Sequence, residues 1–240
     1  MRVVAFDMDG VLVDGQSSWV TVHRSLGTDN EAGYRAFTRG QFDDHQFMRS
    51  DIALWLAKGI DHVDHVRAIL DGVRLREGAE ETVEELKRRD FRTAIVSGGL
   101  DLLAERVGDE LGIDAVLANG LETFEDGRLT GRGILRVPLL NKRAPLAVAV
   151  ARIGGEGTWL ASVGDSAVDI AMFLVSDLSI AFNPRDGVVS EAASRTVISD
   201  DLTDILEFLR PENARPGTGE RRRAEADVLL VQEIYRRHRS

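Results

Sequence analysis

The sequence contains no cysteine, only three lysines and no long apolar run. The absence of cysteine excludes disulfide bonds and thiolate metal sites. No hydrophobic stretch approaches the roughly 20 residues that a membrane-spanning helix needs, so we expect no membrane partner. Asp7 and Asp9 interrupt the N-terminal apolar stretch, which therefore does not resemble a signal peptide. These absences together predict a cytoplasmic protein.

Basic residues are outnumbered by acidic ones. The 240 residues include 40 acidic and 30 basic side chains and carry a formal net charge of −10. Proteins that bind nucleic acid are more often basic, so we expect no nucleic-acid partner. Nearly all basic residues are arginine, and the lysines are Lys58, Lys87 and Lys142. A lysine beside a motif is therefore informative in this chain.

The first fourteen residues carry the clearest functional pattern. Residues 3–6 are a short apolar run typical of a buried strand, and Asp7, Asp9 and Gly10 follow it. Alternate residues of a strand share a face, so we expect the two carboxylates to enter one crevice at the end of the strand. Two close carboxylates repel each other unless a cation joins them or one is protonated. The pattern favours Mg²⁺ chemistry on an anionic substrate over a plain Asx turn or a calcium-type turn.

Strand-like and helix-like segments alternate through the rest of the chain. Strands are predicted at residues 92–99, 158–165 and 177–183, and each ends in polar residues. Helices are predicted at residues 78–89, 101–111, 144–152 and 168–175. This alternation predicts an α/β fold with a parallel sheet. Residues 122–130 contain an Asp-Gly turn between residues of β character and predict a hairpin.

Three segments do not fit this alternation. Residues 16–74 are polar and mostly helical in pattern, and we interpret them as a helical cap inserted into a core of residues 1–15 and 75–208. Residues 209–219 have the composition of a linker. Residues 220–240 predict a C-terminal helix, and an oligomer could form through this helix or through the cap.

Four motifs occur in order: Asp7-x-Asp9, Ser97-Gly98-Gly99, the isolated Lys142, and Gly164-Asp165-Ser166-x-x-Asp169. Each lies at an expected strand or helix end. The chain resembles the haloacid dehalogenase superfamily of phosphohydrolases over about residues 1–208, and within it the phosphoserine phosphatase group. The resemblance implies a doubly wound parallel-sheet core of the Rossmann type with an inserted helical cap.

The resemblance also implies the roles of four carboxylates. Asp7 would attack phosphorus and form an aspartyl-phosphate, and Asp9 would be the general acid and then the general base. Asp7, the backbone carbonyl of Asp9 and Asp165 would bind Mg²⁺. Asp169, one helical turn beyond Asp165, would hold a metal-bound water or orient Lys142.

Phosphate binding is assigned to the remaining motif residues. Ser97 would donate a hydrogen bond to a phosphoryl oxygen, and Gly98 and Gly99 would let backbone N–H groups approach the anion at a helix start. Lys142 would neutralise the transferring phosphoryl group.

Several positions depart from the family pattern. Gln16 stands where the phosphoserine phosphatases place a glutamate for the substrate ammonium. Arg49 or Asp51 falls near the arginine that binds the substrate carboxylate, and Asp51 there would repel phosphoserine. In the last motif the usual asparagine is Val168 and the usual glycine is Ser166. These departures keep the phosphatase core and leave the substrate open.

The predicted function is therefore Mg²⁺-dependent hydrolysis of a small phosphorylated metabolite through an aspartyl-phosphate. Phosphoserine is one candidate, and the alternatives are a sugar phosphate, phosphoglycolate or a nucleotide. Phosphotransfer to a small alcohol would use the same residues. A catalytically idle protein that binds a phosphorylated metabolite is the remaining alternative, and the retention of all four motifs argues against it.

Overall fold

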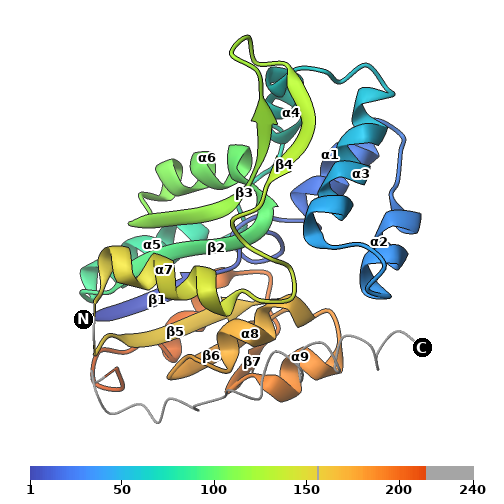
Figure 1. Cartoon of the computed structure of the whole chain (residues 1–240). Coiled ribbons are helices and arrows are strands. Elements are labelled where there is room, and N and C mark those ends of the chain that lie inside the picture. Colours follow the sequence, from blue (N-terminus) through green and yellow to red (C-terminus); the bar gives the residue numbers. More distant parts are fainter. Residues whose placement is uncertain (156, 215–240) are drawn as a thin grey trace.

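A seven-stranded sheet forms the centre of the molecule in the computed structural model, which describes residues 1–155 and 157–214 (Figure 1). The strands are β1 (Arg2–Phe6), β2 (Arg92–Leu100), β3 (Ala115–Thr123), β4 (Leu129–Ile134), β5 (Trp159–Gly164), β6 (Leu178–Phe182) and β7 (Arg195–Val197). Their order is β4-β3-β2-β1-β5-β6-β7. Every neighbouring pair is parallel except β3 and β4.

The central strand β1 is buried on both faces, which explains its uninterrupted apolar sequence. Val4 and Phe6 pack with side chains of α5 (Ala79–Arg88) and α6 (Asp101–Leu111) on one face. Ala5 packs with side chains of α7 (Arg143–Ile153) and α8 (Ile170–Phe173) on the other. Helices on both faces of a largely parallel sheet are the predicted doubly wound architecture.

Strand β1 pairs with β2 on one side, and it pairs with β5, which comes much later in the chain, on the other side. Loops after the three strands therefore diverge and leave a crevice at their carboxyl ends, where open α/β sheets bind ligands. The fold places the first, second and fourth sequence motifs at this edge.

Four helices lie between β1 and α5 in sequence, within the residues 16–74 that were expected to be mostly helical. They are α1 (Ser18–Ser25), α2 (Glu31–Thr38), α3 (Asp44–Leu56) and α4 (Val63–Leu70). We call residues 18–70 the helical insertion, and it lies beyond the carboxyl end of the sheet (Figure 1). Trp19 of α1 stacks on Trp55 of α3 at a centroid distance of 5.2 Å, which joins two of these helices.

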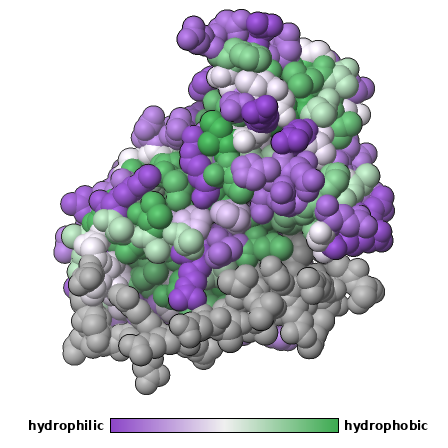
Figure 2. All heavy atoms as spheres, viewed as in Figure 1, coloured by the Kyte–Doolittle hydropathy of each residue, from purple (hydrophilic) through white to green (hydrophobic). Residues whose placement is uncertain are grey.

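The predicted hairpin is confirmed, and it extends from the sheet to the insertion. Asp126 and Gly127 lie in its turn, where Phe124 N–H donates to the carbonyl of Arg128. The N–H of Val63 donates to the carbonyl of Gly127, so the tip of the hairpin holds the start of α4. Hydrophilic residues cover this tip (Figure 2).

The strand predictions agree with the structure to within one or two residues, and so do three of the four helices. The fourth, predicted at residues 168–175, is divided into a 3-10 turn (Ala167–Asp169) and the short α8. The pattern did not show β7, α9 (Gly187–Ala192) or the 3-10 segment Leu202–Glu207.

Two further predictions concern the C-terminal part of the chain. The predicted helix 220–240 lies outside the described residues, as does the part of the predicted linker beyond residue 214. Across residues 1–155 and 157–214, no helix is both long and apolar enough to cross a bilayer.

The packing of α5 on the sheet gives a stability prediction. Leu86 is fully buried in the core, so Leu86→Ala should lower the free energy of unfolding by about 2–5 kcal/mol, as cavity formation in a core generally does. The measurement is urea denaturation followed by circular dichroism. Val148 is 47% exposed on α7, and Val148→Ala should change the free energy by less than about 0.5 kcal/mol. Equal losses in both variants would contradict the assigned core.

Candidate active site

The ends of three adjacent strands bring the first, second and fourth motifs together. Asp7 follows β1, and its N–H donates to the carbonyl of Val163 in β5. Ser97 belongs to β2, and Asp165 follows β5. All three side chains are buried, which is unusual for a polar hydroxyl and two carboxylates and points to a specialised site.

Asp9 reaches the same cavity through a tight turn and not through strand periodicity, because β1 ends at Phe6. The carbonyl of Met8 accepts hydrogen bonds from the N–H groups of the three residues Val11, Leu12 and Val13. Gly10 in this turn has φ +85°, and a Cβ there would collide with the Asp165 carboxylate. Only glycine therefore allows this backbone to pass the acidic cluster.

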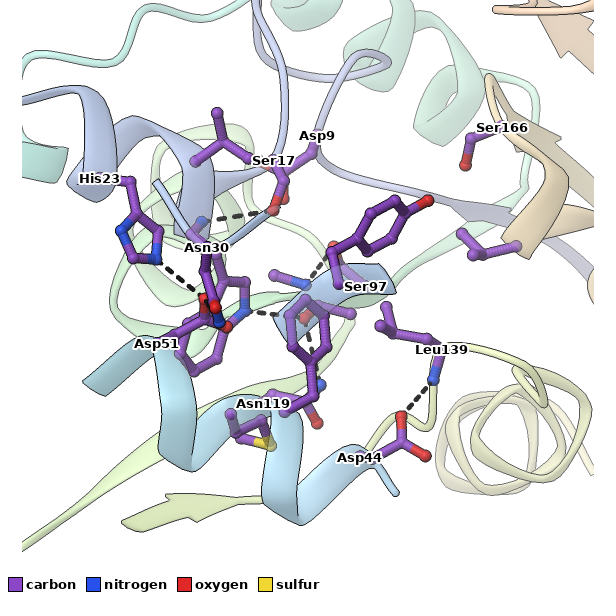
Figure 3. A pocket seen from close by; sticks show the side chains of 18 of the residues that line it. Asp9, Ser17, His23, Asn30, Asp44, Asp51, Ser97, Asn119, Leu139 and Ser166 are labelled. Carbon is purple, nitrogen blue, oxygen red and sulfur yellow. Dashed lines mark hydrogen bonds and ion pairs between the residues drawn. The ribbon is translucent and has the colours of Figure 1, made fainter. Parts of the chain in front are cut away.

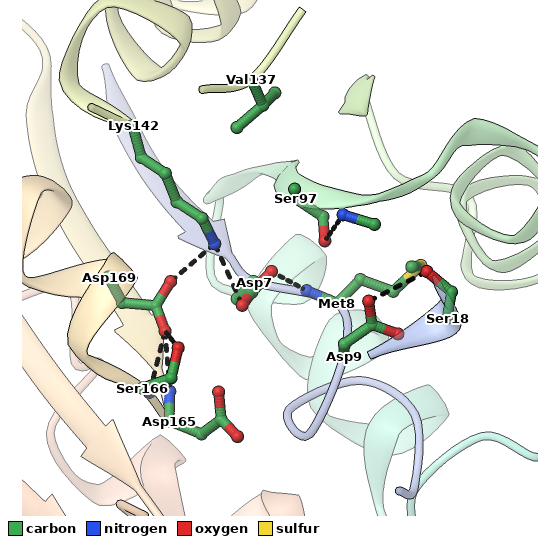
Figure 4. A network of polar contacts seen from close by, with 12 residues as sticks. Asp7, Met8, Asp9, Ser18, Ser97, Val137, Lys142, Asp165, Ser166 and Asp169 are labelled. Atoms are coloured by element: carbon green, nitrogen blue, oxygen red, sulfur yellow. Dashed lines mark hydrogen bonds and ion pairs between the residues drawn. The ribbon is translucent and has the colours of Figure 1, made fainter. Parts of the chain in front are cut away.

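Lys142 joins two of the predicted carboxylates (Figure 4). Its Nζ lies 3.0 Å from Asp7 Oδ2 and 2.7 Å from Asp169 Oδ1, and all three side chains are almost completely buried. Met8 N–H donates to the other oxygen, Asp7 Oδ1, at 2.8 Å. These contacts fix the Asp7 carboxylate and place Lys142 beside it.

Asp169 holds the loop after β5. Its Oδ2 accepts hydrogen bonds from the N–H groups of Asp165 and Ser166 and from Ser166 Oγ, at 3.0–3.1 Å. The expectation that Asp169 follows Asp165 by one turn of a helix was wrong, because Asp165 and Ser166 form a bend after β5 and Asp169 ends a 3-10 turn. Asp169 contacts Lys142, which is the geometry that orienting this lysine requires.

The serine-glycine motif lies opposite the acidic cluster. Ser97 Oγ accepts a hydrogen bond from Gly99 N–H at 3.1 Å. A Cβ on Gly99 would collide with the Asp9 carboxylate and with Ser18 Oγ, and a Cβ on Gly98 would meet Leu139. Both glycines therefore permit close packing at the place where α6 begins.

Sequence reasoning missed Ser18, Trp19 and Asn119. Ser18 Oγ donates to Asp9 Oδ2 at 3.1 Å and accepts from Leu100 N–H at 2.9 Å. Trp19 Nε1 donates to the carbonyl of Gly98, which also accepts from Asn119 Nδ2, each at 3.1 Å. These contacts are long-range, so no local motif announces them.

Arg185 was also missed. Its Nε donates to Asp165 Oδ2 at 2.6 Å, and its backbone N–H donates to the carbonyl of Asp165. Its position after β6, the strand next to β5, was the available signal, because loops after adjacent parallel strands meet at the same edge.

Burial and mutual repulsion shift the acidity of these groups. Burial, together with the Asp7 charge, raises the pKa of Asp9 to about 7. Burial, together with the charges of Asp169 and Asp7, raises the pKa of Asp165 to about 7. Burial likewise raises the pKa of Asp7, and Asp169 acts in the same direction while Lys142 opposes it. Burial disfavours the charged form of Lys142, but Asp169 and Asp7 outweigh it and raise its pKa.

The acidic cluster fits a divalent cation. Carboxylate oxygens of Asp7, Asp165 and Asp169 lie within 4.8 Å of one another. Asp165 Oδ1 and Asp9 Oδ1 are buried and have no hydrogen-bond partner among the described residues. Four buried carboxylates face two cationic side chains, Lys142 and Arg185. A hard cation bound by oxygen ligands would offset the remaining negative charge, and this donor set suits Mg²⁺.

The three residues considered for substrate recognition differ in whether they line the cavity. Asp51 is buried and lines the cavity, whereas Arg49 on the same helix is exposed and does not line it. Gln16 is exposed, accepts a hydrogen bond from Arg24, and does not line the cavity either. Of the two residues considered for the carboxylate-binding position, the structure therefore places Asp51 in the cavity.

The comparisons with known proteins agree with this geometry. Residues 4–174 match the model of the haloacid dehalogenase-like hydrolase family. The chain belongs to this family. Its largely parallel sheet with helices on both faces matches the fold of the solved phosphoserine phosphatase structures.

Several similar proteins are phosphoserine phosphatases. The phosphoserine phosphatase of Methanocaldococcus jannaschii is 31% identical over 87% of this chain and 98% of its own length. That of Wolinella succinogenes is 28% identical over 87% of this chain and its whole length. A solved structure described as a phospho-aspartyl intermediate analogue of phosphoserine phosphatase is 29% identical, with a TM-score of 0.71 over 86% of this chain and 98% of that chain. The chain is a phosphomonoester hydrolase similar to phosphoserine phosphatases.

The raised acid pKa values predict how stability depends on pH without metal. Asp9 and Asp165 have a pKa of about 7 in the folded protein and an ordinary value of 3.8. The folded state therefore binds more protons between these values, and stability should fall as pH rises from about 4 to 7, by up to ~1.4 kcal/mol per unit for each group. Urea denaturation in chelator at several pH values measures this slope.

The matched variant for this test is Asp165→Asn, which removes one of the two groups. Its stability should fall less steeply with pH than that of the wild type. An unchanged slope would contradict the assignment of the shift to Asp165.

Metal addition gives a second prediction. Mg²⁺ should raise the midpoint of thermal unfolding at pH 7.5, because binding to the folded state alone stabilises it. Asp165→Asn should reduce this rise strongly, and Asp109→Asn on the exposed surface of α6 should not. Scanning fluorimetry at increasing Mg²⁺ concentration makes the measurement, and an equal response in all three proteins would place the metal elsewhere.

Proposed function

We propose that Asp7 is the nucleophile of this phosphatase and forms an aspartyl-phosphate. The observation that carries the proposal is the contact of Asp7 Oδ2 with Lys142 Nζ beside the Asp9 carboxyl in one cavity. Lys142 and Met8 N–H hold the Asp7 carboxylate in one orientation. A fixed carboxylate beside a buried cation suits attack on a phosphoryl group, whose negative charge that cation offsets.

Asp9 is the proton donor and acceptor in this mechanism. Asp7 attacks phosphorus, the bond to the alcohol oxygen breaks, and Asp9 gives its proton to that oxygen. Water then attacks the aspartyl-phosphate, gives a proton to Asp9 and releases inorganic phosphate, which restores both side chains. A pKa of about 7 suits both directions of transfer near neutral pH.

The remaining residues bind and orient. Ser97 and Lys142 would contact the phosphoryl oxygens. Asp7, Asp165 and the backbone carbonyl of Asp9 would hold Mg²⁺, which supplies positive charge for the phosphoryl group. Asp169 contacts Lys142 through one oxygen and the loop of Asp165 and Ser166 through the other, so its proposed role is to position both.

The helical insertion acts as the cap. We assign residues 1–15 and 75–208 to the catalytic core and residues 16–74 to the cap, because cap side chains line the cavity that Asp7 and Asp9 also line. The substrate is a small phosphorylated metabolite, and the protein works in the cytoplasm. The absence of cysteine and the net charge of −10 support this location and the lack of a nucleic-acid partner.

Steady-state kinetics test the roles of the two aspartates. Asp7→Asn should abolish Mg²⁺-dependent phosphate release from every phosphomonoester. Asp9→Asn should slow the hydrolysis of alkyl phosphates by about 10²–10⁴-fold, because their alkoxides need a proton to leave. In the first turnover, followed by rapid mixing, it should slow the release of p-nitrophenolate far less, because this leaving group needs no proton. Later turnovers should be slow for both kinds of ester, because water attack on the aspartyl-phosphate also needs Asp9.

Asp14→Asn is the matched control, since Asp14 is exposed, pairs with Arg76 and lies outside the cavity. It should keep the wild-type rates on both kinds of substrate. Full activity of Asp7→Asn, or equal effects of Asp9→Asn on the first turnover of both kinds of ester, would refute the assignment.

A further inference from the structure

The active-site cavity extends well beyond the place for a phosphoryl group. It has a volume of about 540 Å³, and Lys142 and Ser97 line one part of it. Residues of α1, α2 and α3 form the opposite wall, where His23, Asn30 and Asp51 lie together (Figure 3). The alcohol part of a substrate held at Lys142 therefore faces the helical insertion.

This opposite wall is predominantly acidic. Its carboxylates are those of Asp29, Glu31, Asp44 and Asp51, and its basic side chains are His23 and Arg24. Asp29 and Glu31 are exposed, and Glu31 pairs with Arg35. The carboxylates of Asp44 and Asp51 lie deeper, so they dominate the charge that a bound alcohol meets.

Asp51 is the buried centre of this wall. Its Oδ1 accepts hydrogen bonds from His23 Nε2 at 2.8 Å and from Asn30 Nδ2 at 2.7 Å. Within residues 1–155 and 157–214, no hydrogen bond to Asp51 Oδ2 is found, so this oxygen is available to a ligand. Asp51 and His23 together carry one negative charge with a neutral imidazole and none with an imidazolium. In neither state does the pair attract a carboxylate.

Aromatic rings complete the wall. Trp19, Tyr34 and Phe47 line the cavity, and the rings of Tyr34 and Phe47 lie 5.9 Å apart. Aromatic faces attract ammonium groups, and carboxylates do not gain from them. The aromatic rings and the carboxylates of this wall therefore both favour a ligand with a positively charged group.

We propose that the substrate is the phosphomonoester of an amino alcohol, with an ammonium group and no carboxylate. The phosphoryl group lies at Lys142 and Ser97, and the ammonium donates a hydrogen bond to Asp51 Oδ2. This inference rests on the proposed phosphatase function. Hydrolysis breaks the bond between phosphorus and the alcohol oxygen, consumes one water and releases inorganic phosphate and the unchanged amino alcohol.

A substrate that carries a carboxylate would instead be recognised by Arg24. This side chain is exposed, and its Nη2 donates to Gln16 Oε1 at 2.9 Å, so a carboxylate at the cavity mouth could displace this amide. Phosphoserine carries both a carboxylate and an ammonium group. Its recognition would therefore depend on Arg24, whereas that of an amino alcohol phosphate would depend on Asp51.

The test compares kcat/KM for four esters of similar size in the presence of Mg²⁺. They are 2-aminoethyl phosphate, 2-hydroxyethyl phosphate, phosphoglycolate and phosphoserine. We expect 2-aminoethyl phosphate to exceed the neutral 2-hydroxyethyl phosphate roughly ten- to hundredfold, as expected for a hydrogen bond between charged groups. Asp51→Asn should remove most of this preference, and Asp61→Asn, on the exposed surface of the insertion, should keep it.

Binding of the same esters to Asp7→Asn protein, measured by calorimetry, gives a second readout that does not depend on turnover. It should show the same order of affinities. If Asp51→Asn fails to fold, the kcat/KM values of the wild type and the affinities of Asp7→Asn still show whether the charged ester is preferred to the neutral one.

Equal kcat/KM and equal affinity for the charged and neutral esters would overturn the inference. A preference for phosphoserine or phosphoglycolate that Arg24→Gln removes would also overturn it. Lack of Mg²⁺-dependent hydrolysis even of p-nitrophenyl phosphate would refute the proposed phosphatase function instead, and the binding order would then test the ligand class alone.

Discussion

The site depends on compensation of negative charge gathered at the ends of neighbouring strands. Parallel pairing of β1 with β2 and β5 forces Asp7 and Asp165 toward each other, and the turns that follow add Asp9 and Asp169. Burial makes their repulsion costly, because little solvent screens it. Lys142 offsets part of this charge directly, and the remainder creates the affinity for a divalent cation. The same imbalance that costs stability without metal therefore produces the metal site.

The helical insertion is a working part of the site and not only a cover. Trp19 donates to the carbonyl of Gly98 in β2, and Asp44 accepts from Leu139 N–H in the loop before Lys142. The residues proposed to bind phosphate come from the sheet and from the start of α7, while those proposed to surround the alcohol come from the insertion. Phosphoryl chemistry and choice of alcohol are thus encoded in different segments, so one can change in evolution while the other persists.

The core could be read from the sequence because its signals are local. Short apolar strands that end in Asp7, Ser97 and Asp165 fix both the fold and one edge of the sheet, and the isolated Lys142 stands out in a chain poor in lysine. The contributions of Ser18 and Asn119 could not be read in this way, since each meets partners far away in the sequence. Whether the specificity position belongs to Arg49 or to Asp51 also required the actual rotation of α3, which a weakly amphipathic helix does not reveal.

Ser18 links the position of the helical insertion to a carboxylate of the site. It is the first residue of α1, and one hydroxyl holds both the Asp9 carboxylate and the N–H of Leu100. Any outward swing of the insertion that carries α1 with it separates this hydroxyl from Asp9. A phosphorylated side chain on the surface of a folded protein, too bulky to be enclosed, would therefore meet a general acid that has lost one of its supports. The hydroxyl of Ser18 thus couples the position of the insertion to the support of the Asp9 carboxylate, the proposed general acid.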